Sequence, residues 1–170
     1  GGGWKRGDKS MMTGSAKLND WQARGYAVAS VDYRLVPQAT VEDEAADVAS
    51  AVAYIKSNAK RLRFDGGPIV LVGHSAGAHL VALVGTDPTW FAAVGLKLSD
   101  VRGIVPLDGA AYDVPRQLEI GAPLMHQTYV QSFGSNPDDV VDIFWAAISL
   151  YGLLRPRRPK PGSAAQPRPR

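Results

Sequence analysis

Five residues with the sequence GHSAG, Gly73 to Gly77, join two apolar runs of different character. The first run, Ile69 to Val72, is short and uniformly apolar, which is typical of a parallel strand buried on both faces. The second run, Ala76 to Val84, is rich in Ala, Leu and Val and is followed by glycine and proline, which indicates a helix and its end. The sequence therefore predicts a strand, a sharp turn and a helix at this point.

Similar elements lie on both sides of this unit. A short helix over Ala16–Arg24 and a β-branched, alternating strand over Tyr26–Tyr33 precede it. The clearest helix spans residues 41–59, because Thr40 supplies a capping hydroxyl and acidic residues follow it. After the unit, Val101–Leu107 is another apolar strand. The alternation predicts an α/β domain with a mostly parallel sheet and flanking helices.

The chain after the last of these strands has a different composition. Residues 112–135 combine proline, glycine and aromatic residues without a regular period, and we expect an irregular excursion over the edge of the sheet. Residues 136–150 fit one helix with a cap-like Asn-Pro-Asp-Asp start. Proline and arginine dominate after that, and such a segment cannot offset its ordering entropy. We expect an incomplete domain over residues 1–150 and a disordered basic tail over residues 151–170.

Ser75 is the main candidate for chemistry. In a G-x-S-x-G turn between a strand and a helix, the serine hydroxyl projects above the carboxyl end of the sheet. Small neighbours let the two backbones close around it. The first helical amides face the same point, so the Ala76 N–H can donate to an oxyanion that forms there. A serine that only caps a helix is the alternative, but the motif and its context together favour a nucleophile.

Several further segments resemble one known family. The start of the chain, GGGWKRGDK, resembles the end of the HGGGW oxyanion loop of hormone-sensitive-lipase-like and feruloyl or acetyl esterase-like α/β-hydrolases. The same family, arylformamidase-like members included, is similar to VDYRLVPQ at 31–38, VEDEAADVASAVAYI at 41–55, FDGGPIVLVGHSAGAHL at 64–80, GIVPLDGAAYD at 103–113 and FGSNPDD at 133–139. The resemblance covers most of residues 1–142. It lacks the loop histidine and the strands at either end, so the match is to a domain truncated at both ends.

The resemblance implies a partial α/β-hydrolase fold and a carboxylic-ester hydrolase, with no cofactor. Ser75 would attack the carbonyl of a small or short-chain ester and form an acyl-enzyme. Gly1 and Gly2 would donate backbone N–H groups to the oxyanion, opposite Ala76. The side chains expected beside a small-molecule ester are Trp4, His74 and Tyr112. For Trp4, anchoring the loop is an equally good interpretation.

A serine nucleophile also needs a base and an acid that orients the base. The family places both after the nucleophile, where this chain has no recognisable match. Asp108 follows an apolar strand at the carboxyl end of the sheet and is the candidate acid, with a turn-forming aspartate before Gly109 as the alternative. His126 is the candidate base, with a surface histidine as the alternative. His74 and His79 are more typical of packing residues than of a base.

The missing base and acid leave other functions open. The chain could be a non-catalytic remnant of the family, or an arylformamidase-like amide hydrolase. A parallel sheet without its last strands also has an unpaired edge and exposed apolar faces. We therefore expect self-association through an exposed sheet edge.

Composition argues against several other classes of protein. The chain has no cysteine, which excludes disulfides and thiolate chemistry. Six of the 19 basic residues lie in residues 155–170, so residues 1–154 carry 13 − 16 = −3 charges and show no basic patch for nucleic acid. Nucleic-acid or anion binding by the tail is a weaker hypothesis. No apolar stretch approaches the roughly 20 residues that span a bilayer, and no secretory signal is visible, so we expect no membrane association and favour the cytoplasm.

Overall fold

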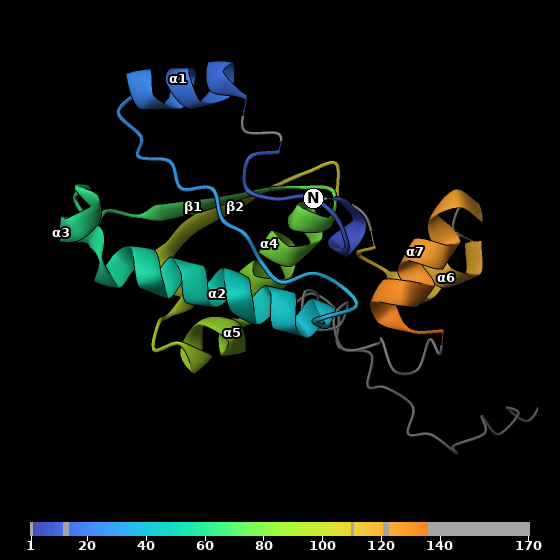
Figure 1. Ribbon diagram of the computed structural model, residues 1–170. Helices are drawn as coiled ribbons and strands as arrows, with labels where there is room; N and C mark the ends of the chain where they lie inside the picture. Colours follow the sequence, from blue (N-terminus) through green and yellow to red (C-terminus); the bar gives the residue numbers. More distant parts are fainter. Residues whose placement is uncertain (1, 12–13, 110, 121–122, 136–170) are drawn as a thin grey trace, which may run out of the picture.

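The protein is described by a computed structural model that covers residues 2–11, 14–109, 111–120 and 123–135. Figure 1 shows how the elements are arranged. In chain order they are η1 (Gly2–Trp4), α1 (Ser15–Ala23), α2 (Val41–Ser57), α3 (Ala59–Leu62), β1 (Ile69–His74), α4 (Ala76–Thr86), α5 (Pro88–Ala93), η2 (Leu98–Asp100), β2 (Val101–Leu107), α6 (Val114–Ile120) and α7 (Pro123–Phe133). The helix expected over residues 136–150 and the tail expected over residues 151–170 lie outside the described residues, so the proposed domain division stays a prediction.

Strands β1 and β2 form a parallel sheet, as the alternation of strands and helices predicts. In its register Leu71 lies opposite Ile104 and His74 lies opposite Leu107. Because the strands are parallel, both end at the same edge of the sheet. The turns that follow His74 and Leu107 therefore meet at this edge, and this is where the candidate site lies.

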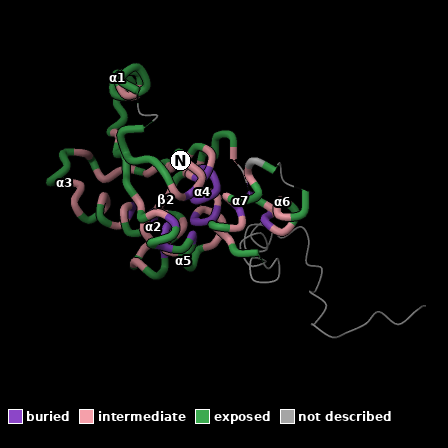
Figure 2. The backbone as a smooth tube through the Cα atoms, turned by 45° about the vertical axis from the view of Figure 1, so that its right-hand side comes forward, coloured by how far each residue is buried: buried purple, intermediate pink, exposed green. Residues whose placement is uncertain are grey.

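Helices α4 and α2 cover one face of the sheet (Figure 1). α4 packs on both strands and α2 packs on α4. An added Cβ at Gly85 of α4 would lie 2.6 Å from Ile104 Cγ2, so only glycine lets the helix come this close to β2. Figure 2 shows the buried residues gathered in this layer, whereas α1 stands apart and is mostly exposed. Fully burying a side chain such as Leu80 contributes about 2 kcal/mol, so this layer supplies much of the stability.

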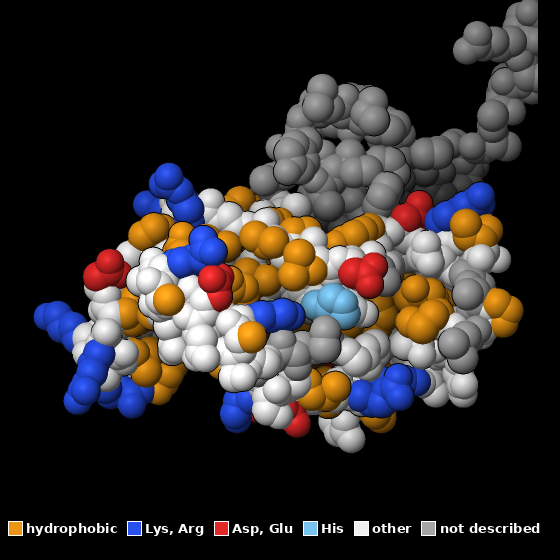
Figure 3. Space-filling view, turned by 90° about the horizontal axis from the view of Figure 1, so that it is seen from above, with side chains coloured by type: hydrophobic (Ala, Val, Ile, Leu, Met, Phe, Trp, Pro, Cys, Tyr) orange, Lys and Arg blue, Asp and Glu red, His pale blue; other side chains and the backbone are white. Residues whose placement is uncertain are grey.

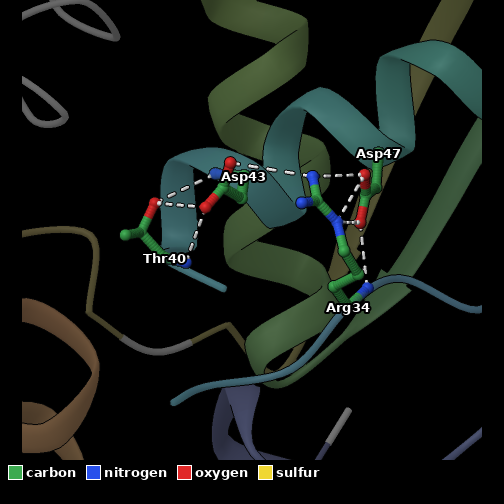
Figure 4. A network of polar contacts seen from close by, with 4 residues as sticks. All are labelled: Arg34, Thr40, Asp43 and Asp47. Carbon is green, nitrogen blue, oxygen red and sulfur yellow. Dashed lines mark hydrogen bonds and ion pairs between the residues drawn. The ribbon is translucent and has the colours of Figure 1, made fainter. Parts of the chain in front are cut away.

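The start of α2 is fixed by a polar network (Figure 4). The Asp43 N–H donates to Thr40 Oγ1 at 3.2 Å, and the Thr40 N–H donates to Asp43 Oδ2 at 3.0 Å, which forms a capping box. The Arg34 guanidinium donates to both carboxylate oxygens of Asp47, and the Arg34 backbone N–H donates to Asp47 Oδ2 at 2.9 Å. These hydrogen bonds lower the pKa of Asp47. They also fix the position of residues 34–40, which lead into α2.

The opposite face of the sheet is exposed. Val70 and Val72 of β1 are 47% and 44% exposed, and Val105 and Leu107 of β2 are 41% and 46% exposed. We call these four residues the open face. Figure 3, which views the molecule from above, shows hydrophobic side chains in a band over the sheet. Parallel sheets are normally covered on both faces, so this apolar surface is unusual.

Two expectations about secondary structure are wrong. Residues 26–33 form no strand: the side chains of Ser30 and Asp32 hydrogen-bond with Lys9, and among the described residues no backbone ladder joins the segment to β1 or β2. The segment expected to be irregular instead contains α6 and α7. Pro115 and Pro123 lie in the first turns of these helices, where the missing N–H has no intrahelical partner to lose. The other predicted helices and strands in the described residues are confirmed, with small shifts at their ends.

Candidate active site

Ser75 lies between β1 and α4 in a strained backbone conformation, with φ 54° and ψ −119°. Residues other than glycine rarely adopt a positive φ, because the Cβ atom crowds the backbone. The Ser75 N–H donates to the Leu107 carbonyl oxygen at 3.0 Å, which ties the turn to the end of β2. A sharp, strained turn from a strand into a helix is the geometry of a nucleophile elbow. Such strain persists only where the surroundings impose it, and it is concentrated at functional sites.

One glycine, Gly73, makes this turn possible. A Cβ added at Gly73 would overlap the backbone carbonyl of Gly77. The backbone at the end of β1 therefore touches the backbone of the first turn of α4. Any side chain at position 73 would push the strand and the helix apart. This close contact explains why the motif has glycine at position 73.

The first amide of α4, that of Ala76, lies before the hydrogen-bond ladder of the helix. The Ala78 and His79 N–H groups both donate to the Ser75 carbonyl oxygen, at 2.9 and 3.1 Å. The Ala76 N–H precedes this ladder, as the first amides of any helix do. Ala76 is itself buried at the base of the turn. The role of its amide as an oxyanion donor stays a prediction.

The second expected group of donors lies in a left-handed turn that we call the glycine turn, Gly2 to Trp4. All three residues have positive φ, at 61°, 62° and 61°. Two glycines adopt this conformation without cost, but Trp4 does not. The turn packs on α4, the helix that follows Ser75. Gly2 therefore belongs to a turn that packs on the helix after Ser75, whereas Gly1 lies outside the described residues.

Trp4 is 1% exposed and sits in an aromatic cluster. Its ring centroid lies 5.5 Å from that of His79, 4.9 Å from that of Phe133 and 6.1 Å from that of Tyr129. The Trp4 carbonyl oxygen accepts a hydrogen bond from the Val36 N–H at 3.0 Å. The side chain thus has the position of a loop anchor, the second of the two roles expected for it. Burial lowers the pKa of His79 to about 4, so this ring is neutral at physiological pH.

Glu44 is a buried carboxyl group close to the glycine turn. It is 0% exposed, and neither carboxyl oxygen has a hydrogen-bond partner in the described part of the chain. Burial raises the pKa of Glu44 to about 8, and the nearby Val36 amide offsets only part of this shift. Burial, together with the charge of Glu44, also raises the pKa of Tyr33. Nothing in the sequence pattern singled Glu44 out, because it lies among the acidic residues of a helix start.

The candidate acid and base are not brought together. Asp108 follows β2 with φ 47°, and its carboxylate lies 3.8 Å from His74 Nε2. The His126 side chain is exposed on α7, and no hydrogen bond or ion pair joins it to Asp108 or Ser75 within the described residues. Tyr112 is 42% exposed, and its hydroxyl packs against Gly109. The structure therefore pairs Asp108 with His74, at the edge of the sheet next to Ser75.

Helix α7 supplies contacts to the site that the sequence reading missed. Tyr129 and Phe133 lie one helical turn apart and both contact Trp4. The i,i+4 spacing of these aromatic residues after a helix-starting proline was the signal that could have identified them.

Within the described ranges, no group of three or more His, Cys, Asp or Glu side chains could hold a metal ion. No helix in these ranges has the length and apolar character needed to span a membrane.

Comparison with known proteins identifies the family. The BD-FAE family model matches residues 1–91, which is more than half of the chain and includes the glycine turn, α2 and the elbow. This chain belongs to the BD-FAE family of α/β-hydrolase esterases. The resemblance seen in the sequence is thereby confirmed.

Curated relatives of this BD-FAE protein are named as ester hydrolases. Esterase LipC of Mycobacterium tuberculosis is 35% identical over 95 residues, which cover 54% of this chain and 23% of LipC. Isoprenylcysteine alpha-carbonyl methylesterase ICME of Arabidopsis thaliana is 35% identical over 82 residues, which cover 48% of this chain and 19% of ICME. The matched region thus spans less than a quarter of either relative.

A solved structure supports the fold class. Esterase B from Lactobacillus rhamnosis, in an inhibited form, superposes with a TM-score of 0.59 at 20% identity. The match covers 87% of this chain and 49% of that one. The prediction of a partial α/β-hydrolase fold is confirmed, with two parallel strands in the described residues.

Proposed function

We propose that this protein is a serine hydrolase of carboxylic esters, with Ser75 as the nucleophile. The observation that carries the proposal is the backbone of Ser75, which holds a serine at φ 54° directly before a helix and against the end of β2. Relatives named as esterases support the same class of reaction. Small or short-chain esters are the proposed substrates, and the exposed side chains of His74 and Asp108 lie at the same edge of the sheet as Ser75.

The proposed reaction passes through an acyl-enzyme. Ser75 Oγ attacks the ester carbonyl carbon and loses its proton to a base, and the carbonyl oxygen becomes an oxyanion. The backbone amides of Ala76, Gly1 and Gly2 stabilise this oxyanion. Collapse of the tetrahedral intermediate breaks the bond to the alcohol, which leaves with a proton. Water then attacks the acyl-enzyme by the same steps and releases the acid.

We propose His126 as the base and Asp108 as the acid. Substrate contact by Trp4, His74 and Tyr112 is also a proposal. His74 and Tyr112 are exposed and flank the turns at the edge of the sheet, whereas the buried ring of Trp4 would act through the loop. Hydrolysis of aryl formamides is a variant of the same proposal, because a formyl group is the smallest acyl group that the site could accept.

A second candidate is a non-catalytic member of the family. It is favoured by one observation: within the described residues, no histidine forms a hydrogen bond with the Ser75 hydroxyl. Serine activation normally requires such a neighbour.

Steady-state turnover of an aryl acetate and of an aryl formamide separates these candidates. For the esterase, wild-type protein turns over the acetate, and Ser75→Ala lowers the rate at least 1,000-fold, as expected for a lost nucleophile. Preference for the formamide would identify the amide hydrolase. Turnover that survives in Ser75→Ala would overturn the proposal, and a folded wild-type protein without turnover would identify the non-catalytic member.

A further inference from the structure

Three residues of helix α7 contact the glycine turn, and a fourth binds Lys5, the residue that follows the turn. A Cβ added at Gly3 would lie 3.0 Å from Thr128 Cγ2, so the helix touches the turn at this glycine. Tyr129 and Phe133 contact the ring of Trp4. Lys5 Nζ donates to Gln131 Oε1 at 2.7 Å. These contacts join two segments more than 120 residues apart in the sequence.

The conformation of Trp4 requires such contacts. A tryptophan at φ 61° is less stable than in its ordinary conformation by on the order of 1 kcal/mol. Backbone strain of this kind persists only where the surroundings impose it, so tertiary contacts must hold the turn. The Trp4 ring makes edge-to-face contacts with His79 of α4 and with Phe133 of α7. The rings of His79 and Phe133 also contact each other, with centroids 5.4 Å apart, so the three rings form one cluster. Phe133 therefore completes the set of contacts that fixes the turn on the nucleophile helix.

We propose that α7 is a clamp for the glycine turn, and that Phe133 is a positioning residue for the oxyanion donors. The inference deepens the proposed function and rests on it for its catalytic meaning. Phe133 does not touch the substrate. It acts through Trp4, by keeping the amides of the turn at a fixed distance from the start of α4. Misplacing such donors by about 1 Å can slow a reaction by on the order of a hundredfold.

The test compares Phe133→Ala with Phe91→Ala. Phe91 is a fully buried residue of α5 in the same core, and among the described residues its ring forms no aromatic pair with Trp4, so it controls for lost packing. We would measure hydrogen exchange of the amides from Trp4 to Lys9, and the rate constant and affinity with which a fluorophosphonate labels Ser75. Both variants should lower the melting temperature. Only Phe133→Ala should speed exchange in this loop at least tenfold and slow the labelling step ten- to a hundredfold, without changing probe affinity.

A milder pair of variants tests the clamp if Phe133→Ala does not fold. Gln131→Ala removes the acceptor for Lys5, whereas Gln131→Glu keeps it. We expect two- to fivefold faster exchange in the first and wild-type exchange in the second. Equal exchange in all variants would overturn the clamp. If wild-type protein is never labelled, the proposed function fails, and the exchange data still decide whether α7 holds the turn.

Discussion

The two faces of the β1–β2 sheet differ in almost every respect. On the covered face, α4 and α2 bury a continuous core. The turn with Ser75 directly precedes α4, and the glycine turn packs on α4. On the open face, four apolar side chains are each more than 40% exposed. His74 and Asp108, at the carboxyl edge, are exposed as well.

This difference explains why only half of the candidate site is well formed. Ser75, Ala76 and the glycine turn owe their geometry to buried contacts and backbone hydrogen bonds on the covered side. The candidate acid, Asp108, contacts His74 in an exposed pair, which contributes little, and the candidate base, His126, is exposed on α7. The half with the proposed nucleophile and oxyanion donors is therefore held by buried contacts, whereas the proposed acid and base are not held in this way by the described residues.

The largest effect is expected from Gly73→Ala, compared with Gly103→Ala. The new Cβ at position 73 would overlap the Gly77 carbonyl, whereas a Cβ at position 103 of β2 meets nothing within 4 Å. We expect the first variant to lose about 3 kcal/mol or more of unfolding free energy and the second less than about 1 kcal/mol. Urea denaturation measures both. Equal losses would mean that the elbow is not closely packed.

A smaller and pH-dependent effect is expected from Glu44→Gln. The folded state raises the pKa of Glu44 from about 4.5 to about 8, so the unfolded chain loses its proton first. Glu44 therefore makes folding less favourable as pH rises from about 4.5 to 8, by on the order of a few kcal/mol. Glu44→Gln should remove this fall in stability.

The control for this measurement is Glu42→Gln, in the same helical turn but exposed. Unfolding free energies of all three proteins would be compared at pH 5 and pH 8. Only Glu44→Gln should gain relative stability at pH 8. A gain of the same size in Glu42→Gln would assign the effect to the general charge of the helix start rather than to burial.

Self-association should respond to charges on the open side of the sheet. We propose that copies of the chain associate through the exposed edge of the sheet, with the open face beside it, although Pro106 lacks an N–H for edge pairing. Val72→Lys should weaken association at least tenfold in sedimentation experiments, with less than about 0.5 kcal/mol change in unfolding free energy. Ile120→Lys, at another exposed apolar side chain, should leave association unchanged. A wild-type protein that stays monomeric at high concentration would contradict the proposal.

The smallest effects are expected from Asp108→Asn and His126→Ala. Both side chains are exposed, so each change should alter the unfolding free energy by less than about 0.5 kcal/mol. The rate of Ser75 labelling by a fluorophosphonate decides their chemical roles. A fall of tenfold or more in either variant would support that residue as acid or base. Unchanged rates would remove both from the proposed mechanism.

The sequence could predict those parts of the fold that depend on neighbouring residues. The elbow follows from GHSAG between two apolar runs, and the start of α2 follows from Thr40 and Asp43. The strand over residues 26–33 could not be judged in this way, because a strand also needs a partner distant in the sequence. The clamp by α7 depends on Phe133 meeting Trp4, a contact that no local pattern encodes.

The burial of Glu44 and the separation of Asp108 from His126 have the same origin. Both depend on how helices and strands pack in space, and an acidic residue at a helix start looks the same whether it faces solvent or the core. Chemistry carried by backbone geometry was therefore easier to predict than chemistry that needs side chains from distant segments to converge.

The central claim is that the strained turn makes Ser75 a reactive nucleophile. The most direct measurement is the mass of the folded protein after reaction with a fluorophosphonate, followed by mapping of the modified peptide. We predict one adduct per chain, located on Ser75 and absent in Ser75→Ala. No adduct on the folded wild-type protein, or an adduct that persists in Ser75→Ala, would contradict the claim.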